Sequence, residues 1–138
     1  MLATAQVSAR ELWMTAMQVQ RWDAGRDGIL TASRLRQRLE AQGLWVSERR
    51  YVPGEAQSDH TVEHDSVEVV LTGLLKLSFN GEAAILAAGD AAFVPRGVKP
   101  LVEVIGSTSV VAFNGAFLPH GPTHGTSGRP RYPRSVWR

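Results

Sequence analysis

The segments GEAQSDHTVEHDSVEVVLTG (residues 54–73) and GDAAFVPRGVKP (residues 89–100) decide the fold of this chain. Glycine begins and ends the first segment, and Gly89, Pro95 and Gly97 punctuate the second. Glycine reaches backbone conformations that other residues avoid, and Pro95 presets the turn that leads to Gly97. The two segments therefore predict β-strands joined by fixed turns.

The hydrophobic period of the sequence changes from helical to two after Gly43. Short runs of alternating apolar and polar residues, separated by turn residues, are typical of β-strands. Asn80-Gly81 predicts a type I′ hairpin turn between two such runs. Many short strands with regular turns indicate a sandwich or a barrel. We expect strands at residues 44–52, 57–64, 67–72, 74–79, 82–87, 91–94, 101–105 and 109–114.

The region before residue 44 carries helical signals. A capping-box spacing at residues 8–11 predicts a short first helix. Residues 17–22 also permit a strand, and residues 23–28 form a turn-rich break.

A second helix should begin at Thr31 or Ser33 and end at Gly43. Leu35 and Leu39 share one face of this helix, while arginines occupy the rest. The sequence therefore predicts a surface helix laid against the barrel.

The composition fits one globular domain of 138 residues, with 43% hydrophobic and 20% charged residues. The absence of cysteine excludes disulfides and thiolate sites. No signal-peptide pattern and no apolar run of membrane-spanning length are present, which favours a cytoplasmic protein without a membrane partner. The net charge is +2, and the positive excess comes from the C-terminal tail, which has four arginines and no acidic residue. Four arginines among prolines are weak support for phosphate contacts, so we expect no nucleic-acid partner.

The spacing of Gly54, Gly73, Gly89, Pro95 and Gly97 resembles the two signature motifs of the cupin superfamily, G-x5-H-x-H-x3-E-x6-G and G-x5-P-x-G-x2-H. This resemblance implies an all-β fold, a cupin-type double-stranded β-helix (jelly-roll) barrel. A short N-terminal helical extension would occupy residues 1–43 and the barrel residues 44–118. Residues 119–138 would form a Pro/Arg-rich C-terminal tail.

The resemblance also implies a divalent metal (Fe, Mn, Ni or Zn) held by three histidines and a glutamate. In this sequence His60 occupies one of these ligand positions, and Val62, Ser66 and Pro100 occupy the others. A metal site needs several converging imidazole and carboxylate groups. We therefore expect no cofactor of this kind, unless a rebuilt site uses His60 and His64.

Glu68 and His64 are separated from His60 by even offsets, so all three would share one face of an unbroken strand. Two interpretations of Glu68 stay open: a cavity residue that could act as a general base, or a solvated glutamate on the outer face, which is the simpler reading. For His64 beside Asp65, a solvated turn residue is the favoured interpretation, and a cavity residue is the alternative. His120 and His124 repeat the same spacing and are interpreted as loop histidines.

Two functions remain at this point. The first is a small-molecule-binding cupin domain without the usual metal centre. The second is a metal-dependent cupin enzyme, a dioxygenase or isomerase, with an atypical site built from His60, His64 and Glu68. Strands that are apolar on both faces, at residues 83–88 and 110–113, need a cover on their outer side, and the cupin resemblance implies that a second subunit supplies it, so we expect a homodimer. The residues expected to line the ligand cavity are His60, Val62, His64, Glu68 and Pro100.

Overall fold

The computed structural model describes residues 17–58 and 61–118. Within them the chain forms mainly strands, with two helices near the N-terminal end. The elements in chain order are β1 (Val19–Arg21), α2 (Ala24–Asp27), α3 (Ala32–Ala41), β2 (Trp45–Tyr51), β3 (Ala56–Ser58), β4 (Ser66–Thr72), β5 (Leu75–Phe79), β6 (Glu82–Leu86), β7 (Asp90–Val94), β8 (Leu101–Val104) and β9 (Val110–Ala116).

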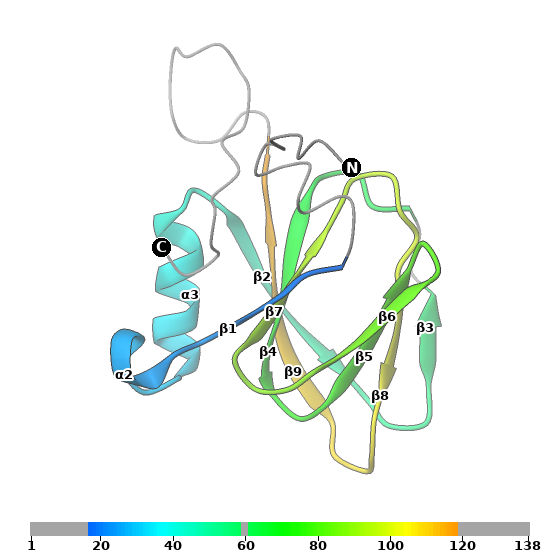
Figure 1. Cartoon of the computed structure of the whole chain (residues 1–138), viewed down its shortest axis with the longest axis horizontal. Helices are drawn as coiled ribbons and strands as arrows, with labels where there is room; N and C mark the ends of the chain where they lie inside the picture. The colour runs from blue at the N-terminus through cyan, green and yellow to red at the C-terminus, as the bar shows by residue number, and fades with distance from the viewer. Residues whose placement is uncertain (1–16, 59–60, 119–138) are drawn as a thin grey trace, which may run out of the picture.

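Two antiparallel sheets face each other, and both helices lie on the outer side of one of them (Figure 1). The five-stranded sheet has the order β1-β7-β4-β9-β2, and the four-stranded sheet has the order β3-β8-β5-β6. All pairings between these strands are antiparallel. Two such sheets closed on a common interior form a jelly-roll barrel. The predicted fold class is confirmed.

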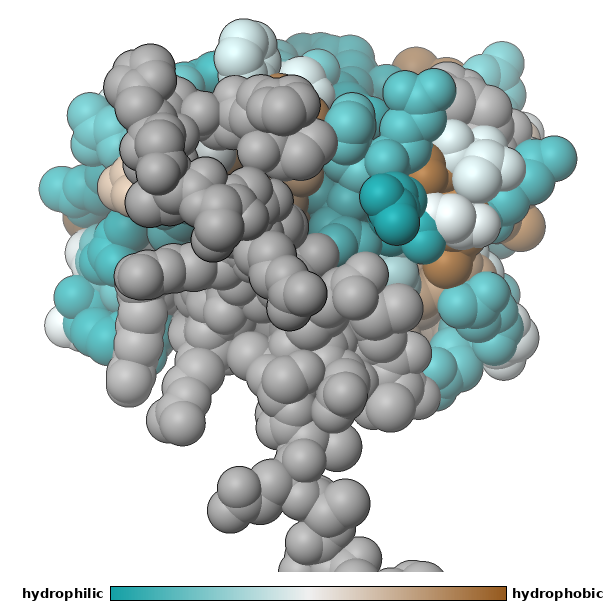
Figure 2. All heavy atoms as spheres, turned by 90° about the horizontal axis from the view of Figure 1, so that it is seen from above, coloured by the Kyte–Doolittle hydropathy of each residue, from teal (hydrophilic) through white to brown (hydrophobic). Residues whose placement is uncertain are grey.

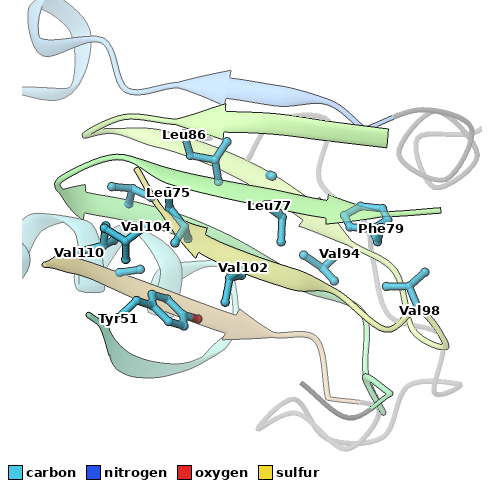
Figure 3. Close-up of a cluster of buried hydrophobic side chains, with 13 residues drawn as sticks. Tyr51, Leu75, Leu77, Phe79, Leu86, Val94, Val98, Val102, Val104 and Val110 are labelled. Carbon is cyan, nitrogen blue, oxygen red and sulfur yellow. The ribbon is translucent and has the colours of Figure 1, made fainter. Parts of the chain in front are cut away.

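The five-stranded sheet buries side chains on both of its faces, because successive residues of a strand point to opposite sides. Along β4, Val67 and Val69 point toward α3, whereas Ser66, Glu68 and Val70 point into the barrel. The barrel interior holds one apolar cluster, contributed by both sheets and shown in Figure 3. A second apolar cluster lies between the five-stranded sheet and α3.

Helix α3 covers the outer face of the five-stranded sheet, as its sequence predicts. Thr31 is the N-cap residue, and its hydroxyl accepts a hydrogen bond from the Arg34 amide at 3.1 Å. Leu35 and Leu39 are fully buried against the sheet. The Arg36 guanidinium lies 5.2 Å from the centre of the Phe113 ring.

A buried carboxylate attaches the short helix α2 to α3. Asp27 accepts hydrogen bonds from Arg26 and Arg38, each at 2.9 Å, and its side chain is inaccessible to solvent. The hydrogen bond from Arg26 is the main reason why the pKa of Asp27 falls to about 2. Sequence reasoning expected only a turn-rich break here. One helical turn forms instead, because the Asp23 side chain accepts from the Gly25 amide and caps it.

The predicted hairpin between β5 and β6 is present. Asn80 and Gly81 have φ values of 52° and 76°, as a type I′ turn requires. Gly89, one of the motif glycines, allows a close approach of two segments. Its carbonyl accepts a hydrogen bond from the Trp22 amide at 2.9 Å, and a Cβ at this position would lie 2.9 Å from Trp22 Cβ.

Three predicted elements differ from the structure or lie outside it. The strand expected at residues 57–64 is wrong in length, because β3 ends at Ser58 and the following described residues form a loop. Residues 19–21 realise the strand alternative and pair with β7, so the N-terminal region contributes an edge strand to the barrel. The helix expected at residues 8–16 and the tail at residues 119–138 lie outside the described residues.

The outer faces of the two sheets show what covers the strands that the sequence predicts to be apolar on both sides. Phe113 is covered by α3 of the same chain, so residues 110–113 need no second subunit to bury them. On the four-stranded sheet, Ile85 and Leu101 remain exposed. Among the coloured residues in Figure 2, most are hydrophilic, and hydrophobic side chains appear between them. Self-association of this chain stays a prediction.

Candidate functional site

A cavity of about 300 Å³ lies inside the barrel, bounded by both sheets and by two loops. The cavity borders the apolar interior cluster, because Tyr51, Leu77, Val94 and Val102 belong to that cluster and also line the cavity. Its outer end includes the exposed Glu63. The lining residues come from the five-stranded sheet (Arg49, Tyr51, Ser66, Glu68, Val94, Asn114, Ala116), from the four-stranded sheet (Leu77, Val102) and from loops (Val62, Glu63, His64, Pro100).

The polar side of the cavity is centred on Glu68, whose residue is 3% exposed. The Tyr51 hydroxyl donates a hydrogen bond to Glu68 Oε2 at 2.9 Å. Asn114 Nδ2 donates another to Glu68 Oε1 at 3.2 Å. Each carboxylate oxygen therefore has a donor, as a buried carboxylate requires.

Neighbouring strands bring these three side chains together. Glu68 on β4 pairs directly with Asn114 on β9, and β9 also pairs with β2, which carries Tyr51. In the view of Figure 3 the Tyr51 hydroxyl points along the barrel, toward the end where Val94 and Val98 lie. The network therefore follows from strand register and inward alternation.

Burial raises the pKa of Tyr51 far above its ordinary value of 10.0, and the negative charge of Glu68 raises it further. Arg49, whose guanidinium lies against the Tyr51 hydroxyl, opposes this rise. Tyr51 therefore remains a neutral hydrogen-bond donor throughout the physiological pH range. Tyr51 is therefore suited to act as a fixed hydrogen-bond donor in the cavity wall and not as a phenolate base.

The structure places four of the five expected site residues on the cavity wall: Val62, His64, Glu68 and Pro100. The fifth, His60, lies outside the described residues. Glu68 is buried and faces inward, so the simpler reading of an outward, solvated glutamate is wrong. His64 is half-buried at the rim and contacts the cavity.

Val62 and His64 reach the cavity by a different route from the one expected. An unbroken strand would have carried them on the same face as Glu68, but β4 begins at Ser66. The loop instead folds against the segment after β7. The Val62 amide donates to the Val98 carbonyl, and the Val62 carbonyl accepts from the Gly97 amide, both at 2.9 Å.

Asp65 fixes the end of this loop where β4 begins. Its side chain accepts a hydrogen bond from the Arg96 amide at 2.7 Å, and its carbonyl accepts from the Phe117 amide at 2.8 Å. The turn at residues 95–97 therefore holds the loop that contains Val62 and Asp65 in place through hydrogen bonds from its backbone amides. Together the two loops form the rim of the cavity.

The described residues do not fit the metal centre that the cupin resemblance implies. Val62, Ser66 and Pro100 stand at three ligand positions and do line one cavity, yet valine and proline side chains offer no donor atom. Glu68 lies one inward position further along β4 and is held by Tyr51 and Asn114. Within residues 17–58 and 61–118, no cluster of three or more His, Cys, Asp or Glu side chains could hold a metal ion.

Sequence reasoning missed Arg49, Tyr51 and Asn114. A signal for them was present, because all three lie in predicted strands, where every second side chain points into the barrel. Finding them required knowing which strands are adjacent. The register β2–β9–β4 supplies that information.

None of the helices in the part of the chain that the structure describes is long and apolar enough to cross a membrane.

No protein-family model and no curated protein sequence matches this chain. Similar solved structures include AerE from Microcystis aeruginosa, at 16% identity and a TM-score of 0.50, matched over 53% of this chain and 35% of AerE. An RmlC-like cupin family protein with a double-stranded β-helix fold, from Methanocaldococcus jannaschii, matches at 20% identity and a TM-score of 0.48, over 53% of this chain and 68% of that one. Drosophila melanogaster CENP-C bound to CAL1 matches at 16% identity and a TM-score of 0.47, over 50% of this chain and 61% of that one. This chain thus spans less than two thirds of the AerE and CENP-C chains, and at these identities the likeness concerns the fold alone.

Proposed function

We propose that this chain is a cupin domain that binds a small molecule in its barrel cavity and does so without the family's metal centre. The observation that carries the proposal is the composition of the cavity wall. Positions that would hold a metal carry Val62, Ser66 and Pro100, while a hydrogen-bonded polar network lies deeper on the five-stranded sheet.

The cavity has the properties of a ligand site. Its volume of about 300 Å³ lies at the lower end of the range typical of small-molecule pockets. Apolar side chains, among them Leu77, Val94 and Val102, face a small number of polar groups. Such a wall gives affinity through apolar burial and orientation through a few hydrogen bonds.

Burying the Glu68 carboxylate costs free energy unless both of its oxygens accept hydrogen bonds. A carboxylate taken out of water needs donors on both oxygens. Glu68 has them, and the residues that supply them come from two further strands. The network therefore stabilises the shape of the cavity in the absence of a ligand, which lowers the entropy cost of binding.

A screen of small compounds by ligand-observed NMR tests the proposal. We expect compounds that bind the protein and lose binding in Ala116→Phe, because the new ring would fill the cavity from β9. Ala83→Phe is the matched control, since Ala83 is exposed on the outer side of β6. The proposal of a cavity ligand would be refuted if every compound that binds did so equally to the wild-type protein, Ala116→Phe and Ala83→Phe, or if no compound bound the wild-type protein.

Elemental analysis separates this function from the alternative of a metal-dependent enzyme. Protein purified without chelators or metal-affinity steps should contain well below one transition-metal ion per chain. Stoichiometric iron, manganese, nickel or zinc that is lost in His60→Ala would overturn the metal-free proposal. It would favour an atypical enzyme site built around the histidines.

A further inference from the structure

The charged side chains that the strands contribute to the cavity wall, Glu68 and Arg49, already interact with neighbouring groups, whereas Glu63 lies on the rim loop and is exposed. Glu68 accepts from Tyr51 and Asn114, and it has further interactions. The Arg49 side chain is hydrogen-bonded to the Tyr51 side chain. A charged ligand would therefore have to displace existing interactions of these groups.

Two uncharged polar groups differ from them. The Ser66 hydroxyl belongs to a residue that is 4% exposed, lines the cavity and has no hydrogen-bond partner within the described part of the chain. Asn114 uses one amide hydrogen for Glu68. Its carbonyl oxygen and second amide hydrogen have no partner among the described residues. Polar groups that line a cavity and have no protein partner there are open to hydrogen bonds from a bound molecule.

These two groups lie on one polar strip of the wall. Asn114 is directly opposite Glu68 in the β4–β9 register, and Ser66 is the preceding inward residue of β4. Ser66 and Asn114 are thus diagonal neighbours, whose separation in antiparallel sheets is about 7–8 Å. A molecule with two hydroxyl groups on one edge can reach both.

The cavity wall opposite Ser66 and Asn114 is apolar. Leu77 and Val102 face the strip from the four-stranded sheet, and Pro100 adds an apolar ring from the loop. The cavity volume of about 300 Å³ corresponds to on the order of ten water molecules. The ligand is therefore small and carries one apolar face.

We infer that the ligand is an uncharged hydroxylated molecule with an apolar face, and that Ser66 and Asn114 are the residues that recognise its hydroxyl groups. The inference rests on the proposed function, since it names the ligand class for the same cavity. Ser66 stands at a family metal-ligand position and here takes the role of a hydrogen-bonding group.

Three probes of nearly equal size and different charge test the inference: 2-hydroxybenzyl alcohol, 2-hydroxybenzoate and 2-hydroxybenzylammonium. Titration of ¹⁵N-labelled full-length protein, followed by two-dimensional NMR, gives a dissociation constant and the affected residues for each. We expect the neutral probe to bind at least about tenfold more tightly than either ion, because beside Ser66 and Asn114 each ion would meet the charges of Glu68 and Arg49, which are already paired. The amide signals of Ser66 and Asn114 should move.

Side-chain variants test the two recognition residues. Ser66→Ala and Asn114→Ala should each weaken the neutral probe about fivefold, the effect of one lost hydrogen bond. Ser78→Ala, on the outward side of β5, is the matched control and should change nothing. Circular dichroism and thermal unfolding establish that each variant is folded.

The outcomes distinguish this inference from the proposed function. Tighter binding of either ion, or undiminished binding by Ser66→Ala and Asn114→Ala, overturns the uncharged ligand class. In that case compounds lost in Ala116→Phe would still support a cavity ligand. If no probe and no screened compound moves a cavity signal, both proposals fail.

Discussion

The hydrogen bond between Tyr51 and Glu68 gives the sharpest quantitative prediction. Tyr51→Phe removes one hydroxyl and leaves the ring in the apolar cluster, so that packing is retained. The change deprives Glu68 Oε2 of a donor at 2.9 Å, at a residue that is 3% exposed. A hydrogen bond to a buried charged group contributes about 1.5–3 kcal/mol. We expect the free energy of unfolding of Tyr51→Phe to fall by that amount.

A double-mutant cycle isolates the pair from other effects of each substitution. Glu68→Gln removes the charge while nearly keeping the shape, and the double variant Tyr51→Phe/Glu68→Gln completes the cycle. The coupling free energy should be about 1–2 kcal/mol, because the partners share one buried network. Urea denaturation followed by circular dichroism measures all four proteins. Loss of less than about 0.5 kcal/mol in Tyr51→Phe, or strict additivity, would refute the reasoning.

The same residue predicts a dependence on alkaline pH. The pKa of Tyr51 is raised in the folded protein above its ordinary value of 10.0, by burial first and by the Glu68 charge second. Its contribution to stability is therefore complete below pH 10 and is lost as the pH rises beyond it. The wild-type protein should lose more stability than Tyr51→Phe above about pH 10. Equal losses in the two proteins would contradict the raised pKa.

Three further predictions concern the helices and the lost metal positions. Because the pKa of Asp27 is lowered from 3.8 to about 2, its contribution to stability should vanish as the pH falls through this range, and Asp27→Asn should remove that acid dependence in urea titrations. Leu35→Ala should cost roughly 2–5 kcal/mol by opening a cavity under α3, and a loss below 1 kcal/mol in the same assay would contradict full burial. The triple variant Val62→His/Ser66→Glu/Pro100→His places two histidines and a carboxylate around one cavity, a ligand set that suits Fe(II). Calorimetric titration should show stoichiometric metal binding that the wild-type protein lacks, and its absence would mean that the three positions do not converge.

Much of the barrel could be predicted because its signals are local. The turn at Asn80-Gly81 needs positive φ at both residues, and few sequences other than Asn-Gly supply it. The alternation of Leu75, Leu77 and Phe79 fixes which face of β5 is buried. Each of these elements is specified within a few residues, so the sequence is sufficient to find it.

The polar network could not be predicted in the same way, because it depends on strands far apart in the chain. Tyr51 and Glu68 are seventeen residues apart, and Glu68 and Asn114 are forty-six apart. An isolated strand sequence does not reveal whether a glutamate among valines faces water or a tyrosine. Burial of Glu68 becomes reasonable only when two donors are known to lie beside it.

The apolar character of both faces was also ambiguous from sequence. For residues 110–113 the second apolar face packs under α3, whose own pattern predicts a buried stripe. For β6 the outer face remains exposed at Ile85. Sedimentation of the full-length chain, compared with Ile85→Lys, would test whether this face contributes to the expected homodimer.

The position of the carboxylate accounts for a cavity that is polar although three of the family's ligand positions carry Val62, Ser66 and Pro100. The cupin resemblance places a glutamate at the position of Ser66, near the rim beside Val62 and Pro100. Here the carboxylate is Glu68, the next inward residue of β4, about 7 Å further along the strand. At that depth it lies opposite Asn114 and within reach of Tyr51, so its oxygens are used inside the barrel wall. The three positions nearer the rim carry valine, proline and a serine hydroxyl, and two of these side chains have no atom that could ligate a divalent ion.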